Sequence, residues 1–141
     1  MRAVAERSPS EDPVVLLIAV GLAAGRLAIG GALWLAPAVC ARALGLGVLD
    51  RRELTLARIA ATRDVLLGLW QLRSLGEAAE LRRASSAVAV ADAGDAVAFG
   101  LMLRSGGERT AALRGLAGAV PASLAGAWLV RRSRMNLSAT G

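Results

Sequence analysis

The sequence contains no histidine, lysine or tyrosine, and it has only one cysteine and one phenylalanine. A single cysteine excludes an internal disulfide, and the absence of histidine removes the usual ligand sets of zinc and haem sites. We therefore expect neither a metal nor another cofactor. The missing side chains also leave few partners for acid–base or nucleophilic chemistry, so an enzyme is not the favoured interpretation.

The abundant residues are small and apolar. Hydrophobic residues make up 55% of the 141 positions, aromatic residues make up 3%, and there are 16 glycines. Soluble cores depend on aromatic and large branched side chains, whereas small residues suit helices that pack closely within lipid. We expect an integral membrane protein, with a soluble helical bundle as the alternative.

The net charge is +6, and all seventeen basic residues are arginine. Such a charge is also found in nucleic-acid-binding proteins, but here the arginines are scattered between apolar runs, without stacking aromatics or a basic helix face. Arginines that flank membrane spans have this distribution. We therefore expect a lipid bilayer, and not nucleic acid, as the partner.

Four apolar stretches have about the length of roughly 20 residues that a bilayer requires. They run over residues 14–36, 54–75, 84–103 and 110–130. Short connections between them predict an all-α fold, a four-helix transmembrane bundle in an up-down-up-down arrangement over residues 14–130. Residues 1–13 and 131–141 are predicted to be disordered tails, the second of them basic. The first stretch is longer than the apolar run of about 7 to 15 residues in a secretory signal, which favours a retained span.

The arginines outside these stretches are unevenly shared between the two ends of the bundle. Eight lie in the two tails and the second loop, and five lie in the first and third loops. Because cytoplasmic segments carry the excess of basic residues, this bias predicts that both termini lie in the cytoplasm. The abundance of Ala, Arg and Gly is typical of a GC-rich bacterial genome, so we expect a multi-pass protein of the bacterial inner membrane.

Five charged residues fall near the middle of the first three stretches: Arg26, Arg63, Asp64, Asp92 and Asp95. At about 1.5 Å rise per residue, all five lie within roughly 3 Å of one plane. Each central Arg or Asp costs about 2.5 to 3.5 kcal/mol on insertion scales, so these side chains need partners. We expect them to form one buried polar network.

The expected pairing places Arg26 and Arg63 against Asp92 and Asp95, with Asp64 as a third acid. Neighbouring side chains on a helix point about 100° apart, so we do not expect Arg63 to pair with Asp64. Small residues beside these charges predict close helix packing, and they are Gly21, Gly25, Gly30 and Gly68. A dimer contact at Gly21 and Gly25 is the alternative.

Several short motifs together resemble a family of small four-span bacterial membrane proteins, abundant in actinobacteria, for which no activity is established. They are Gly25-Arg26 with Gly30, the exit Leu35-Ala36-Pro37, Arg58 with Arg63-Asp64 and Gly68, and Asp92-x-x-Asp95. The resemblance covers residues 14–130. It implies a four-span architecture and a membrane location, and it implies no mechanism.

Three functions are compatible with the charges at mid-depth. The favoured one is a structural network that holds the helices together, in a protein that associates with copies of itself or with another membrane protein. The first alternative is a proton-linked transporter of a small solute, or a subunit of one, in which a spare carboxyl binds the proton. The second is a membrane enzyme that acts on a lipid or isoprenoid, with one of the three aspartates as acid or base.

Overall fold

The computed structural model describes residues 12–138, and their side chains as far as Ser133. Within that part of the chain there are five α-helices, one 3-10 turn and no strand, so the predicted all-α fold is confirmed. The helices are α1 (Pro13–Leu35), α2 (Pro37–Leu44), α3 (Arg51–Arg73), α4 (Ala78–Arg104) and α5 (Arg109–Ser138), with the 3-10 turn η2 (Ser74–Gly76) before α4.

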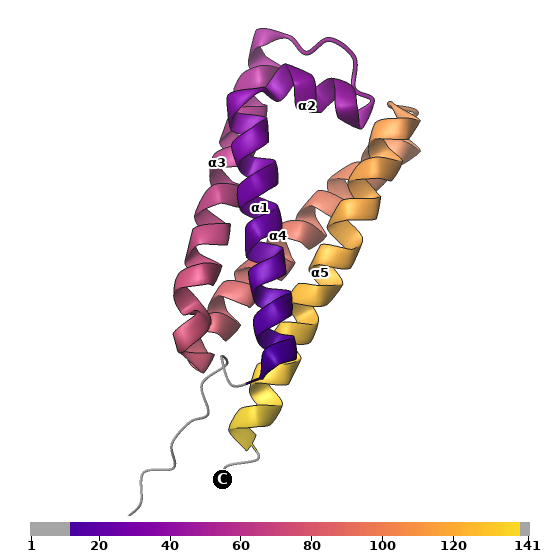
Figure 1. Cartoon of the computed structure of the whole chain (residues 1–141). Coiled ribbons are helices and arrows are strands. Elements are labelled where there is room, and N and C mark those ends of the chain that lie inside the picture. Colours follow the sequence, from indigo (N-terminus) through magenta and orange to yellow (C-terminus); the bar gives the residue numbers. More distant parts are fainter. Residues whose placement is uncertain (1–11, 139–141) are drawn as a thin grey trace, which may run out of the picture.

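The four long helices form two antiparallel pairs (Figure 1). Helix α1 packs mainly on α3, and α4 packs mainly on α5, whereas contacts between the two pairs are fewer. The short helix α2 lies across the end far from the termini. At the opposite end, the start of α1 meets the last turns of α5, where Arg132 bonds Asp12 at 3.3 Å. We call these the α2 end and the termini end.

Three helical segments are long and apolar enough to cross a membrane, which indicates a membrane protein. They are Pro13–Leu35, Ala78–Arg104 and Arg109–Ser133. Helix α3 was predicted as a fourth span and has the same length as α1, 23 residues. It is not among the three because Arg58, Arg63 and Asp64 interrupt its apolar part.

Two segments differ from the sequence-based prediction. Helix α2 occupies part of a connection that we expected to be a loop. Pro37 is its first residue, a position where proline is favoured, and Gly45 ends it with a positive φ of 89°.

The predicted disorder of residues 131–141 is wrong as far as Ser138, because α5 continues through the basic segment. No glycine or proline interrupts residues 127–140, so nothing in the sequence stops the helix.

The predicted N-terminal tail, residues 1–13, lies largely outside the described residues. Its last two positions are structured: Pro13 begins α1, and Asp12 caps it by accepting hydrogen bonds from the amides of Val14 and Val15. The bond from the Val15 amide lowers the pKa of Asp12, so this carboxylate is charged where it meets Arg132.

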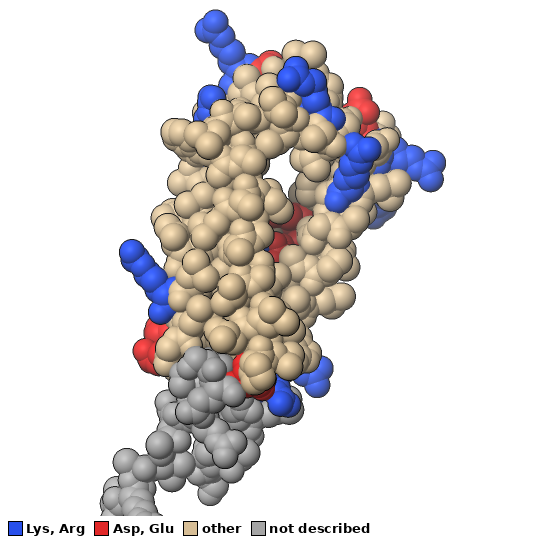
Figure 2. All heavy atoms as spheres, in the orientation of Figure 1, with Lys and Arg blue, Asp and Glu red and all other residues tan. Residues whose placement is uncertain are grey.

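An apolar core fills the termini end of the molecule, formed by Val15, Ala19, Leu81 and Leu129 with Ile18, Leu22 and Leu75 around it. Toward the α2 end the two helix pairs are less tightly joined, and Figure 2 shows an opening between them. The fold is therefore tightly packed in one half and open in the other.

Two of the four glycines predicted to pack helices do so. A methyl group at Gly30 would lie 3.0 Å from the Ala61 carbonyl oxygen, and one at Gly68 would lie 3.0 Å from the Ala23 carbonyl oxygen. These contacts bring α1 and α3 together. The prediction is wrong for Gly21 and Gly25 within this chain, because a methyl group built there would have no described atom of another helix within 4 Å.

Candidate functional site

The structure brings together all five charged residues that the sequence placed at mid-depth. They come from three helices: Arg26 from α1, Arg63 and Asp64 from α3, and Asp92 and Asp95 from α4. We call this set the Arg/Asp cluster. Acidic atoms are visible in the hollow between the two helix pairs, below the opening toward the α2 end (Figure 2).

Arg26 is the buried centre of the cluster. Its Nη1 donates to Asp64 Oδ1 at 2.8 Å, and its Nη2 donates to Asp92 Oδ1 and, at 3.4 Å, to the carbonyl oxygen of Val88. The side chains of Arg26 and Asp92 are each 9% exposed. One guanidinium group therefore links α1 to both α3 and α4.

Arg63 forms the outer part of the cluster. It holds Asp95 with two parallel bonds, from Nη1 to Oδ1 at 3.0 Å and from Nη2 to Oδ2 at 2.7 Å. These two side chains are 39% and 34% exposed. A fork of this kind fixes both distance and orientation, so it sets the register of α3 against α4.

Arg63 also contacts its neighbour Asp64, contrary to the sequence-based expectation. Its Nε and Nη2 donate to Asp64 Oδ1 at 3.3 and 3.1 Å. Helix geometry fixes only the directions of the Cα–Cβ bonds, whereas the long arginine side chain bends back to an acid that also faces Arg26. Asp64 thus accepts bonds from both arginines.

The cluster has three carboxyl groups for two guanidinium groups, so it carries one formal negative charge when all five are ionised. The three carboxyl groups are not equally compensated. Asp92 Oδ2 is buried and has no hydrogen-bond partner among the described residues. A buried carboxylate oxygen without a partner is a position where a proton can be held.

Two further polar side chains continue the polar interior toward the termini end. Gln71 and Ser85 are fully buried, and within the described part of the chain the Gln71 amide and the Ser85 hydroxyl have no partner. Gln71 lies seven residues after Asp64 on α3, and Ser85 lies seven residues before Asp92 on α4, which is about two helical turns in each case. The same spacing was visible in the sequence, but neither residue was assigned to the site.

In residues 12–133, no group of three His, Cys, Asp or Glu side chains is placed to hold a metal ion. The arrangement has the groups to tie helices together by ion pairs and to take up a proton at a buried carboxyl group. No protein-family model, curated protein or solved structure matches this chain.

Proposed function

We propose that this chain is a four-span protein of the bacterial inner membrane in which the Arg/Asp cluster acts mainly as a structural link between the two helix pairs. The observation that carries the proposal is that each of the five side chains has an ion-pair partner on another helix. Two of these ion pairs cross between the helix pairs, which contact each other less than the helices within each pair do, so they add to the apolar packing there.

The energetics of insertion support this role. Five uncompensated central charges would cost about 12 to 18 kcal/mol at about 2.5 to 3.5 kcal/mol each. Such a sum is as large as or larger than the whole stability of an ordinary domain, about 5 to 15 kcal/mol. The pairing of Arg26 and Arg63 with their acids offsets much of this cost and at the same time fixes which helices are neighbours.

Helix α3 is the proposed fourth span. At about 1.5 Å per residue it is roughly 35 Å long, enough for a hydrocarbon core of about 30 Å. Large apolar side chains are exposed along it, and they are Leu56, Ile59, Leu66, Leu69 and Trp70. Arg58 lies nearer the α2 end and donates to the Trp34 carbonyl oxygen at 3.4 Å. The two central charges of α3, Arg63 and Asp64, are paired, so the remaining face of the helix suits lipid.

Both termini are proposed to lie in the cytoplasm, as the arginine bias predicts. The structure reduces that bias, because Arg58 and Arg114 also reach the α2 end, where Arg114 donates to the Ala43 carbonyl oxygen at 2.6 Å. With these two residues the α2 end has seven arginines, and the termini end has eight. The family resemblance supports the bacterial membrane location, and the orientation calls for a direct measurement.

The single cysteine provides that measurement. Cys40 lies on α2, and Glu77 is an exposed residue that follows α3 at the other end. In intact cells, a membrane-impermeant maleimide is expected to label Cys40 and to leave residue 77 unlabelled in the variant Cys40→Ser/Glu77→Cys until the membrane is opened. Labelling of both positions from one side would contradict α3 as a span, and the reverse pattern would contradict the orientation alone.

A second candidate function, proton-linked transport of a small solute, is favoured by one feature of the cluster. Asp92 Oδ2 is buried without a partner among the described residues, and Gln71 and Ser85, also buried, continue the polar interior toward the termini end. A proton held there would neutralise the surplus charge of Asp64, Asp92 and Asp95 against Arg26 and Arg63.

Infrared spectroscopy of the reconstituted protein tests this second function. A protonated carboxyl band is expected between about pH 5 and 9; it should disappear in Asp92→Asn and persist in Asp95→Asn, with both variants folded. If no carboxyl group is protonated in that range, the cluster has only its structural role.

A further inference from the structure

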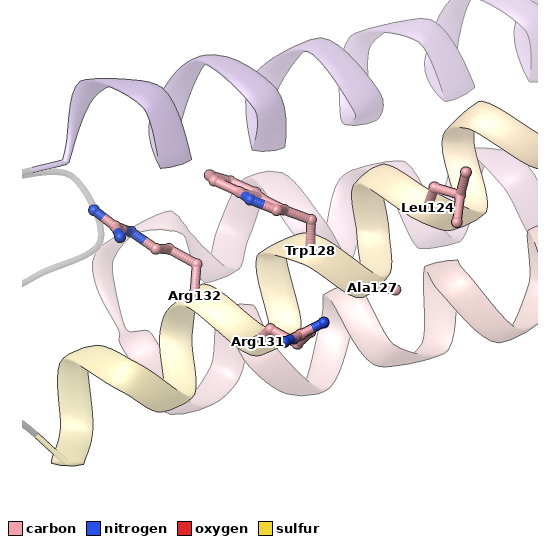
Figure 3. A pocket seen from close by; sticks show the side chains of 5 residues that line it. All are labelled: Leu124, Ala127, Trp128, Arg131 and Arg132. Carbon is pink, nitrogen blue, oxygen red and sulfur yellow. The ribbon is translucent and has the colours of Figure 1, made fainter.

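A groove on the outer surface of α5 has a polar and an apolar end (Figure 3). It has a volume of about 420 Å³ and is lined by Leu124, Ala127, Trp128, Arg131 and Arg132. These positions follow the spacing of one helix face, at i, i+3, i+4, i+7 and i+8. The groove is therefore a strip along α5 that ends at the termini end of the molecule.

The order of side chains along the strip matches the order of layers at a membrane surface. From Leu124 to Arg132 the helix advances about 12 Å, at about 1.5 Å per residue. Leu124 and Ala127 lie toward the centre of the span, Trp128 follows, and the two arginines come last. Tryptophan is favoured at the level of lipid headgroups and arginine just outside it.

The positive charge of the groove is only partly compensated. Arg131 is exposed and has no ion pair within the described residues. Arg132 contacts Asp12 through Nε and Nη2, each at 3.3 Å, and its side chain stays 45% exposed. Asp12 is at the same time held by the Val14 and Val15 amides as the cap of α1. The groove therefore carries two arginines, of which one contacts a carboxylate that is already engaged as a helix cap.

We propose that this groove binds an anionic phospholipid, with the phosphate on Arg131 and Arg132 and one acyl chain along Leu124, Ala127 and Trp128. The inference rests on the proposed position of α5 in a membrane. Arginine suits phosphate because its planar group offers several donors in a fixed geometry.

Quenching of tryptophan fluorescence by brominated lipid tests the proposal. The variant Trp34→Phe/Trp70→Phe leaves Trp128 as the single tryptophan. It is reconstituted in phosphatidylcholine vesicles that contain increasing fractions of brominated phosphatidylglycerol or brominated phosphatidylcholine. Each arginine near the surface strengthens binding of an anionic lipid about fivefold. We expect the anionic lipid to quench Trp128 with at least a fivefold preference.

Two matched variants define the site. In the single-tryptophan background, Arg131→Gln/Arg132→Gln is expected to reduce the preference to about one, whereas Arg82→Gln/Arg83→Gln on α4 removes the same charge at the same end and should leave it unchanged. Equal quenching by both lipids, or equal loss in both variants, would overturn the lipid site while leaving the membrane span intact. Absence of quenching by either lipid would overturn the membrane span as well.

Discussion

Replacing Arg26 with glutamine is expected to abolish most of the folded protein. The substitution leaves Arg63 alone against three carboxylates, and it removes the one ion-pair partner that Asp92 has among the described residues; the Asp92 side chain is 9% exposed. Removing one partner of a buried ion pair costs about 3 to 5 kcal/mol, which is a large share of a stability of about 5 to 15 kcal/mol. The measurement is the fraction of membrane-inserted chain recovered as a monodisperse species in mild detergent, together with its thermal unfolding midpoint.

Arg58→Gln is the matched control for Arg26→Gln. It makes the same chemical change, but Arg58 is exposed, and the one described hydrogen bond of its side chain is to the Trp34 carbonyl oxygen, at 3.4 Å. Surface changes away from buried networks usually alter stability by less than about 0.5 kcal/mol. Similar losses in the two variants would show that burial and pairing at Arg26 are not what stabilises the protein.

The double substitution Asp64→Asn/Asp92→Asn is expected to destabilise the protein far more than the single aspartate substitutions do. Each single Asp→Asn change at position 64, 92 or 95 leaves two acids for two arginines, and each arginine keeps at least one of them. We expect single variants to lose about 1 to 2 kcal/mol, the scale of one weakened hydrogen bond to a charged group. Asp64→Asn/Asp92→Asn leaves Arg26 buried without an acid, so it should lose about 3 to 5 kcal/mol more than the sum of its parts.

The variant Asp64→Asn/Asp95→Asn is the control for this effect. It isolates Arg63 in the same way, but the Arg63 side chain is 39% exposed and can turn toward a more polar environment. Its loss should therefore be closer to additive. Unfolding midpoints of the three single and two double variants provide the comparison, and strict additivity in both double variants would contradict the pairing.

Much of the architecture follows from hydropathy and helix geometry alone. The positions of the long helices are set by runs of apolar residues, and the rise per residue places Arg26, Asp64 and Asp92 at one depth whichever way the bundle points. Because a buried charge must be compensated, coincidence in depth on separate helices is enough to group the cluster from the sequence alone.

The details of pairing could not be obtained in this way. Helix angles predict where Cβ atoms point, but the reach of a flexible arginine decides its contacts, and so Arg63 contacts Asp64. Helix α2 is too short for its periodicity to stand out. Gly21 and Gly25 have the spacing of a packing motif, and only the crossing of α1 with its neighbours shows that Gly30 and Gly68 form the close contacts.

The most direct test of the structural role of the Arg/Asp cluster is rescue of Arg26→Gln by a second substitution. Adding Asp92→Asn removes the carboxylate that Arg26→Gln leaves unpaired, and it restores the formal charge of the cluster to that of the natural chain. We expect the unfolding midpoint of Arg26→Gln/Asp92→Asn in detergent to recover most of the loss, whereas Arg26→Gln/Asp95→Asn, which changes charge equally but leaves Asp92 unpaired, should recover little. If the two double variants are equally unstable, or equally recovered, specific pairing between α1 and α4 is not what joins the two halves of the molecule.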